Sequence, residues 1–203
     1  MCHRVLCYGD SNTYGYDPRS YLGDRYPESV RWTSLLERQG WQVFNQGENG
    51  RSIPQREWEL EEIIQMIFRL NPNIVTIMLG SNDLLQAPTL SAEDCSQRME
   101  RFLRELLNQT PSCEFLLIAP PPMQIGAWVG DHKAIETSLR LAECYEAAAD
   151  RLGIYFADAG AWDIGLSFDG VHFSDAGHHT FAEKMDQTLR CIKSETDQAD
   201  ARG

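Results

Sequence analysis

The sequence predicts a single α/β domain with a three-layer, flavodoxin-like fold. Short apolar runs that are typical of strands alternate with longer stretches that have helical periodicity. The runs at residues 74–79 and 115–119 are apolar throughout, which is typical of parallel strands with both faces covered. The length of 203 residues suits one hydrophobic core and is short for two. We therefore expect about five parallel strands in the order 2-1-3-4-5, with helices on both faces of the sheet.

Three shorter apolar runs, at residues 3–8, 41–45 and 154–157, complete the expected sheet. In open sheets of this kind, ligands bind at the carboxyl ends of the strands. The polar residues that directly follow each strand are therefore the first place to look for a functional site.

Five helices are expected between and after these strands, at residues 30–39, 55–70, 92–108, 133–152 and 175–192. Ser52 and Pro54 are typical of a helix start, as are Ser91 and Ser174. Gly153 is typical of a helix end. The sequence shows no internal repeat and no linker, so we expect one domain over residues 1–193 and a disordered polar tail over 194–203.

Composition limits the partners. The formal net charge of −12 repels phosphate, so we expect neither nucleic acid nor an anionic membrane surface as a partner. No apolar run reaches the roughly 18 residues of a membrane span, and with the first strand at residues 3–8 we expect no signal peptide in this sequence. A mature chain whose signal had been removed would look similar. A cytoplasmic protein is expected. The six cysteines show no CxxC pair and no regular spacing, which favours scattered thiols over a zinc site, a redox motif or a disulfide framework.

The segment Gly9-Asp10-Ser11-Asn12-Thr13 directly follows the first expected strand. A serine at this position lies on the ligand-binding edge, where the free N–H groups of a helix start can stabilise an anion. The same residue types are also typical of a plain turn followed by a helix cap.

The segment Asp169-Gly170-Val171-His172 precedes the last expected helix. A carboxylate three residues before a histidine can accept its Nδ1–H, which leaves Nε2 free to take a proton from a hydroxyl. The alternative is a turn that leads to the Ser174 cap, with His172 on the surface.

Two more polar segments follow strands and contain candidate hydrogen-bond donors for an oxyanion. Asn82 follows the strand at 74–79, and Gly47 follows the strand at 41–45. Each also fits a turn without a catalytic role. Together with Ser11, Asp169 and His172, however, they supply a nucleophile, a base, a residue that orients the base, and two oxyanion donors. That set of roles predicts acyl transfer.

These segments resemble the conserved blocks of the SGNH (GDSL-type) hydrolases. Gly9-Asp10-Ser11, with Asn12 in place of the usual Leu, is similar to the first block, and Gly47 to the second. Gly80-x-Asn82-Asp83 is similar to the third block and Asp169-x-x-His172 to the fifth. Within the family, the sequence is most similar to the bacterial arylesterase and acyltransferase branch, in three segments: Arg31-Trp32, Ile77-Met78-Leu79-Gly80 and Pro120-Pro121-Pro122.

The resemblance implies a serine esterase for small, acetyl-type esters, with acyl transfer as a further activity. Ser11, His172 and Asp169 would form the triad, and Ser11, Gly47 and Asn82 the oxyanion hole. It implies a small-molecule ester substrate and neither a metal nor an organic cofactor. Homo-oligomerisation is a further hypothesis from the same branch.

Trp128 and Asn12 are the candidate substrate contacts. Trp128 lies in the irregular segment 120–132, which should overhang the active face, as should the segment 14–29.

Other interpretations remain open at this point. A flavodoxin-like binding protein without catalysis, a scaffolding protein with vestigial residues, and a thioesterase or lysophospholipase of the same family all fit the fold. A metal hydrolase is less favoured, because the only acid–histidine cluster is the segment 169–179 and it contains no HExxH motif.

Overall fold

Five parallel strands form one sheet in the order β2-β1-β3-β4-β5 in a computed structural model, which describes residues 3–20, 22–87, 89–130 and 132–200. This confirms the predicted fold class and strand order. The strands are β1 (Arg4–Gly9), β2 (Gln42–Gly47), β3 (Ile74–Met78), β4 (Glu114–Ala119) and β5 (Tyr155–Asp158).

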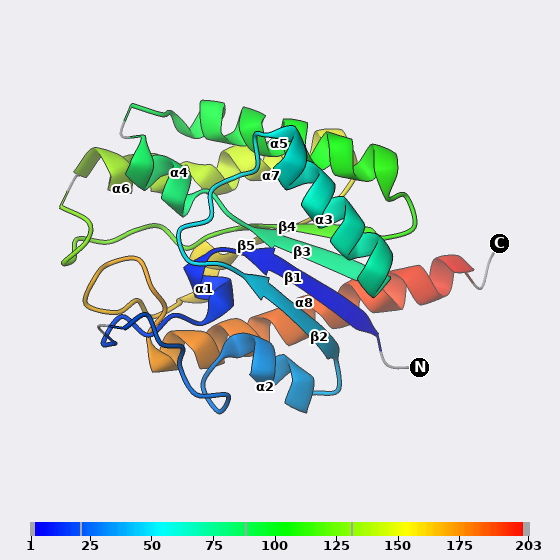
Figure 1. Cartoon of the computed structure of the whole chain (residues 1–203), viewed down its shortest axis with the longest axis horizontal. Helices are drawn as coiled ribbons and strands as arrows, with labels where there is room; N and C mark the ends of the chain where they lie inside the picture. Colours follow the sequence, from blue (N-terminus) through cyan, green and yellow to red (C-terminus); the bar gives the residue numbers. More distant parts are fainter. Residues whose placement is uncertain (1–2, 21, 88, 131, 201–203) are drawn as a thin grey trace.

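Helices cover both faces of the sheet, as predicted (Figure 1). They are α1 (Ser11–Tyr14), α2 (Trp32–Arg38), α3 (Glu57–Leu70), α4 (Ser81–Gln86), α5 (Ala92–Gln109), α6 (His132–Leu139), α7 (Leu141–Leu152) and α8 (Asp175–Asp200), with a 3-10 helix at Ala159–Trp162. Helices α3, α5 and α7 pack on one face, and α2 and α8 on the other.

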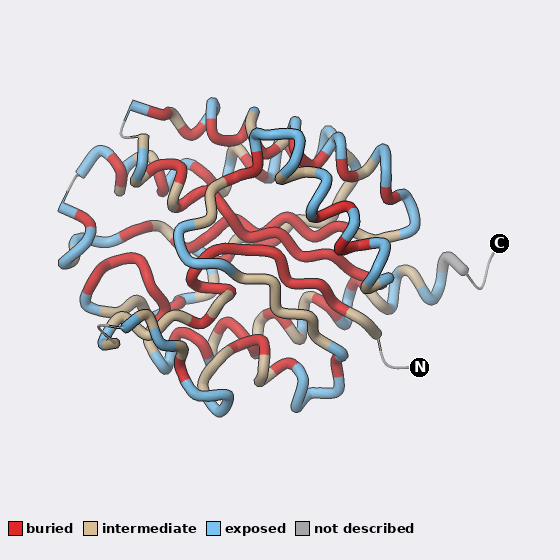
Figure 2. Tube along the Cα trace, viewed as in Figure 1, coloured by how far each residue is buried: buried red, intermediate tan, exposed pale blue. Residues whose placement is uncertain are grey.

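The core forms two clusters, one on each side of the sheet, because successive side chains of a strand point to opposite faces. On β1, Leu6 and Tyr8 face the α3, α5 and α7 side, whereas Val5 and Cys7 face α2 and α8. The central strands β1, β3 and β4 are buried along most of their length, whereas the edge strands β2 and β5 are mostly half-buried (Figure 2). Burial on both faces explains why the central strands are mainly apolar.

Helix ends differ in how well the sequence predicts them. Ser91 caps α5 as expected, with its Oγ accepting the Asp94 N–H at 3.0 Å. Helix α3 starts later than Ser52 and Pro54 suggest. The Glu59 carboxylate there accepts the N–H groups of Gln55 and Arg56, at 3.0 and 2.9 Å.

Two expected segments differ from the structure. The helix expected at 133–152 is two helices, α6 and α7, separated at Arg140. The tail expected to be disordered from residue 194 is helical as far as Asp200, because α8 continues through it. Once a helix has formed, each added residue gains a backbone hydrogen bond without a new nucleation cost. Residues 201–203 lie outside the described part of the chain.

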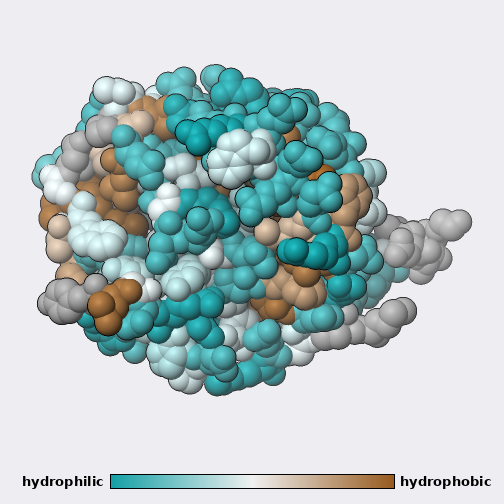
Figure 3. All heavy atoms as spheres, in the orientation of Figure 1, coloured by the Kyte–Doolittle hydropathy of each residue, from teal (hydrophilic) through white to brown (hydrophobic). Residues whose placement is uncertain are grey.

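The surface shown in Figure 3 is mostly hydrophilic, consistent with the charged composition. No helix among the described residues has both the length and the apolar character needed to cross a membrane. Five cysteines, Cys7, Cys95, Cys113, Cys144 and Cys191, carry free thiols, and Cys2 lies outside the described residues.

The packing under α8 provides a test of the fold. Phe181 is fully buried, with ring centroids 4.8 Å from Trp32 and 5.1 Å from Phe173. Phe181→Ala should lower the free energy of unfolding by about 3–5 kcal/mol, because the cavity forms in a rigid core. Phe68 on α3 is 61% exposed, so Phe68→Ala should change it by less than about 0.5 kcal/mol. Urea unfolding followed by circular dichroism measures both, and equal effects would contradict this packing.

Candidate active site

The turn after β1 places Ser11 at the first position of α1. Asp10 caps this short helix, and its Oδ1 accepts the Asn12 N–H at 2.9 Å. Burial raises the pKa of Asp10 to about 6. Gly9 is required by the tightness of this turn, since a Cβ there would lie 2.1 Å from Thr13 Oγ1. The geometry of the turn therefore fixes the direction of the Ser11 hydroxyl.

Ser11, His172 and Asp169 are brought together as the sequence predicts. His172 Nε2 lies 2.8 Å from Ser11 Oγ, and His172 Nδ1 lies 2.7 Å from Asp169 Oδ2. Asp169 Oδ1 accepts the N–H groups of Val171 and His172, both at 2.9 Å. Burial alone raises the pKa of Asp169, but these hydrogen bonds outweigh it and hold the pKa below its usual value. The carboxylate is therefore ionised and faces the imidazole.

A pocket of about 190 Å³ opens onto this triad. Its lining consists of Ser11, Tyr16, Asn49, Gly50, Asn82, Leu85, Trp128, Val171 and His172. Two of the sequence-predicted site residues outside the triad, Asn82 and Trp128, therefore lie on the pocket. The other two, Gly47 and Asn12, do not line it.

Gly47 serves a packing role at the end of β2. Its N–H donates to Asn45 Oδ1 at 2.9 Å, so it is not free for an oxyanion. A Cβ at this position would lie 2.0 Å from the Tyr14 backbone nitrogen, which explains the glycine. Our assignment of Gly47 as an oxyanion donor therefore disagrees with the structure.

Gly50, three residues further on, lies on the pocket instead. Its φ of +78° favours glycine, and its N–H has no acceptor in the part of the chain that the structure describes. Sequence reasoning missed this residue, although the loop after β2 contains both glycines. Which of the two reaches the pocket depends on how the loop folds.

Asn82 is the second residue of α4, directly beyond the positive-φ turn at Gly80. One N–H of its side-chain amide donates to the Arg51 carbonyl at 3.1 Å. The amide has a second N–H, which is available to a ligand. The Arg51 guanidinium in turn donates to the Gly9 carbonyl at 2.9 Å and lies over the Tyr8 ring. The loop that carries Gly50 is thus attached to the ends of the central strands.

Asn12 is buried, and its side chain bonds within the protein. The amide donates to the Val171 carbonyl at 3.1 Å, and Oδ1 accepts the Phe173 N–H at 2.9 Å. The structure therefore places the Asn12 side chain outside the pocket lining, with both amide atoms bonded to the histidine segment.

Two aromatic rings cover the imidazole. The Tyr16 and Trp128 ring centroids lie 4.7 and 5.0 Å from that of His172, and 5.9 Å from each other. The Trp128 side chain is half exposed, and its backbone N–H donates to the Asp169 carbonyl at 3.2 Å. Trp128 thus forms one wall of the pocket beside His172.

The acid–histidine segment 169–179 does not form a metal site. Asp169 and His172 bind each other, while His178 is buried between the rings of Tyr26 and Phe173. Burial lowers the pKa of His178 to about 3. Among the described residues, no group of three or more His, Cys, Asp or Glu side chains could hold a metal ion.

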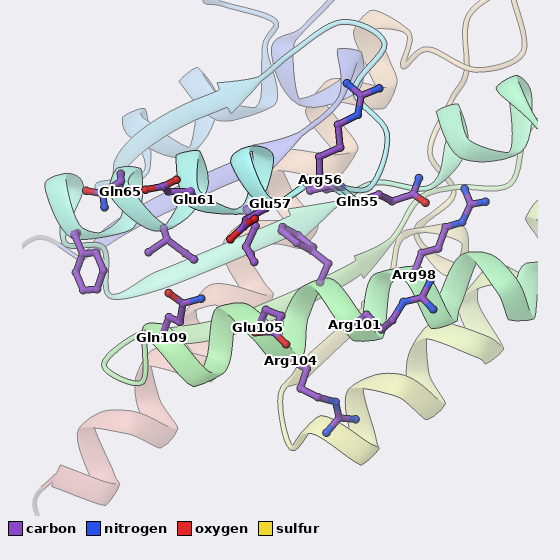
Figure 4. A pocket seen from close by; sticks show the side chains of 15 residues that line it. Gln55, Arg56, Glu57, Glu61, Gln65, Arg98, Arg101, Arg104, Glu105 and Gln109 are labelled. Atoms are coloured by element: carbon purple, nitrogen blue, oxygen red, sulfur yellow. The ribbon is translucent and has the colours of Figure 1, made fainter.

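A larger groove of about 860 Å³ lies between α3 and α5 (Figure 4). Its lining is mainly charged and amide side chains, such as Glu57, Gln65, Arg98 and Arg101, above an apolar floor. It includes no serine, cysteine or histidine. The groove therefore has no counterpart of the Ser11–His172 pair that lies on the smaller pocket.

A serine, a histidine and a buried aspartate joined by hydrogen bonds form the arrangement of the serine hydrolases. The sequence profile of the GDSL-like lipase/acylhydrolase family matches residues 7–180. The protein therefore belongs to this family, the SGNH hydrolases, whose members are serine carboxylic ester hydrolases.

Solved structures of similar fold come from several bacteria. An aryl esterase of M. smegmatis is 23% identical with a TM-score of 0.84, and a proposed arylesterase of Agrobacterium tumefaciens is 29% identical with a TM-score of 0.80. A carbohydrate acetylesterase of Sinorhizobium meliloti is 22% identical with a TM-score of 0.81. Each similarity covers 94% of this chain and 99% of the other. A search of curated proteins gave no match.

Because His178 is buried, we expect the free energy of unfolding to fall in acid. Between pH 6.5 and about 3, the unfolded chain binds a proton at this residue and the folded protein does not. Its contribution to stability is therefore complete above pH 6.5 and is lost as the pH falls, by about 1.4 kcal/mol per pH unit. His178→Gln should remove this slope.

Urea unfolding of the wild type and the variant between pH 4 and 7 measures the difference. Wild type and variant must be compared because Asp10, whose pKa is raised, makes the folded protein more stable as the pH falls, which opposes the effect of His178. His179 is exposed, so His179→Gln is the matched control. If the unfolding free energies of wild type and His178→Gln changed with pH in the same way, the prediction would be contradicted.

Proposed function

We propose that this protein is a serine esterase that cleaves small, acetyl-type esters through an acyl-enzyme on Ser11. The observation that carries the proposal is the hydrogen-bonded series from Ser11 through His172 to Asp169, which opens onto a small pocket. The family supports ester hydrolysis as the type of reaction. The geometry of the site supports the roles of the individual residues.

In the first step, Ser11 Oγ attacks the ester carbonyl while His172 Nε2 accepts the hydroxyl proton. Asp169 keeps Nδ1 protonated and stabilises the imidazolium that forms. The two backbone N–H groups on Asp169 Oδ1 favour its ionised form, so the carboxylate does not take the proton itself.

Three donors are proposed for the negative charge that develops on the carbonyl oxygen. They are the Ser11 N–H, the Gly50 N–H and the second N–H of the Asn82 amide. Gly50 replaces Gly47 in this role because it lines the pocket, whereas the Gly47 N–H is bound to Asn45. These donors are fixed before the reaction, which is the condition for strong transition-state stabilisation.

The alcohol part of the ester leaves on the side of His172, because His172 returns its proton to the leaving oxygen. Tyr16 and Trp128 cover that side. Their faces suit a flat ring, which agrees with the aryl and carbohydrate esters named for the structural neighbours. The small pocket leaves room only for a short acyl group.

Water completes the reaction by attacking the acyl-enzyme, and another alcohol in its place would give acyl transfer. A small-molecule ester is thus the expected partner. Cytoplasmic location and homo-oligomerisation stay predictions from the sequence. An oligomer would cover exposed apolar side chains such as Leu22, Ile125 and Phe168.

Hydrolysis of p-nitrophenyl acetate, butyrate and octanoate tests the proposal directly. The wild type should turn over the short esters best, and Ser11→Ala should lose at least about 10³-fold in kcat, because the variant lacks the hydroxyl that bonds to His172 Nε2. A fluorophosphonate probe should label the wild type at Ser11 and leave the variant unlabelled. Equal, slow rates for both proteins and no labelling would reject the esterase proposal.

Removal of the Asn82 amide tests the oxyanion hole separately. Asn82→Ala should lower kcat for p-nitrophenyl acetate by about 10²–10³-fold, because one transition-state donor is lost. Since the donor acts mainly in the transition state, KM should change little. Asn82→Asp has the same shape but cannot donate when ionised, so it should be at least as slow. Full activity of either variant would assign the oxyanion to other groups.

A further inference from the structure

We propose that Asn12 is a positioning residue whose side-chain amide holds the histidine segment against the nucleophile. This inference deepens the proposed function and rests on its triad. Asn12 is the residue directly after Ser11, and it bonds to the residues directly before and after His172. One side chain therefore connects the nucleophile turn to both sides of the base.

The two hydrogen bonds run in opposite directions. Asn12 Nδ2 donates to the Val171 carbonyl at 3.1 Å, and Asn12 Oδ1 accepts the Phe173 N–H at 2.9 Å. A single bond would let the segment 171–173 rotate about it, whereas two bonds from one planar amide fix both position and orientation. A primary amide offers a donor and an acceptor on two separate atoms, whereas an apolar side chain offers neither and a hydroxyl offers both on a single atom.

Asn12 itself is firmly held. Its N–H donates to Asp10 Oδ1 at 2.9 Å, and its carbonyl accepts the Trp32 indole N–H at 2.9 Å. Trp32 is fully buried under α8. The Asn12 amide therefore attaches the histidine segment to the protein core and not to a surface loop.

The opposite side of the histidine segment is held by the loop around residues 124–128. The N–H groups of Gln124 and Trp128 donate to the carbonyls of Gly170 and Asp169, at 2.9 and 3.2 Å. These bonds fix the segment to a pocket wall and not to Ser11. The His172 carbonyl also accepts the Ser167 N–H at 2.7 Å. Among these attachments, only the Asn12 side chain belongs to the nucleophile turn, so we attribute to it the 2.8 Å separation of His172 Nε2 and Ser11 Oγ.

Replacement of Asn12 predicts two distinct effects. Asn12→Leu leaves the Val171 carbonyl and the Phe173 N–H without their partner, so the segment shifts and the base leaves its position. Asn12→Asp keeps the shape of the side chain. Its protonated carboxyl can donate to Val171 and accept from Phe173, but its ionised form has no donor and repels the Val171 carbonyl. Burial raises the pKa of such a carboxyl, so both forms occur within an accessible pH range.

The test is the pH profile of kcat and KM for p-nitrophenyl acetate, from about pH 5 to 9, for wild type, Asn12→Leu and Asn12→Asp. Asn12→Leu should lose about 100-fold in kcat at every pH, the scale of a misplaced catalytic group, with KM within about threefold. The kcat of Asn12→Asp, divided by that of the wild type, should fall as the pH rises.

Ser96→Ala is the matched control. The buried Ser96 hydroxyl donates to the Cys144 carbonyl at 2.9 Å and connects α5 to α7, away from the pocket. Its removal should lower the unfolding free energy without changing kcat. If Asn12 had a purely structural role, Asn12→Leu would likewise lower the unfolding free energy and leave kcat unchanged.

Two results would overturn the proposal: a folded Asn12→Leu protein with wild-type kcat, or an Asn12→Asp ratio that does not change with pH. If Asn12→Leu does not fold, the profile of the isosteric Asn12→Asp decides alone. Absence of Ser11-dependent turnover in the wild type would overturn both this proposal and the esterase function. Normal turnover with unaffected Asn12 variants would overturn only the positioning role.

Discussion

The parallel pairing of β1 with its two neighbours is the constraint on which the site depends. Gly9 pairs with Gly47 on β2 and with Met78 on β3, so β1, β2 and β3 end at the same level. The turns after them carry Ser11, Gly50 and Asn82. Because hydrogen bonds along the whole strands fix this register, the positions of the reacting groups are set by the sheet and not by the loops alone.

The site also depends on the satisfaction of buried polar groups. Asp10, Asn12, Asp169 and His172 are almost fully inaccessible to solvent, and each has hydrogen-bond partners within the protein. In this environment an unpaired polar atom is costly, so the network has few alternative arrangements. Burial raises the pKa of Asp10, whereas at Asp169 the hydrogen bonds from His172 and Val171 outweigh burial and lower the pKa.

The fold and the triad could be predicted because their signals are local. Apolar strands and the polar segments after them are visible in the sequence, and parallel pairing brings Ser11 and His172 to one edge. The short helices α1 and α4 were not predicted, because four to six residues show no periodicity. The path of the loop from Gly47 to Gly50 and the direction of the Asn12 side chain could not be predicted. The first depends on contacts with Tyr14 and Arg51, and the second on partners about 160 residues away along the chain.

The wall of the pocket is attached to the triad through backbone atoms. The Trp128 N–H, not its indole, bonds to Asp169, and Ala127 and Gln124 attach in the same way to Phe168 and Gly170. A change of side chain at position 128 would leave these bonds in place. Substrate preference in this protein can therefore evolve through single substitutions in the pocket wall that do not disturb the reacting groups. Because its side chain takes no part in these backbone bonds, Trp128 is also a suitable position for engineering.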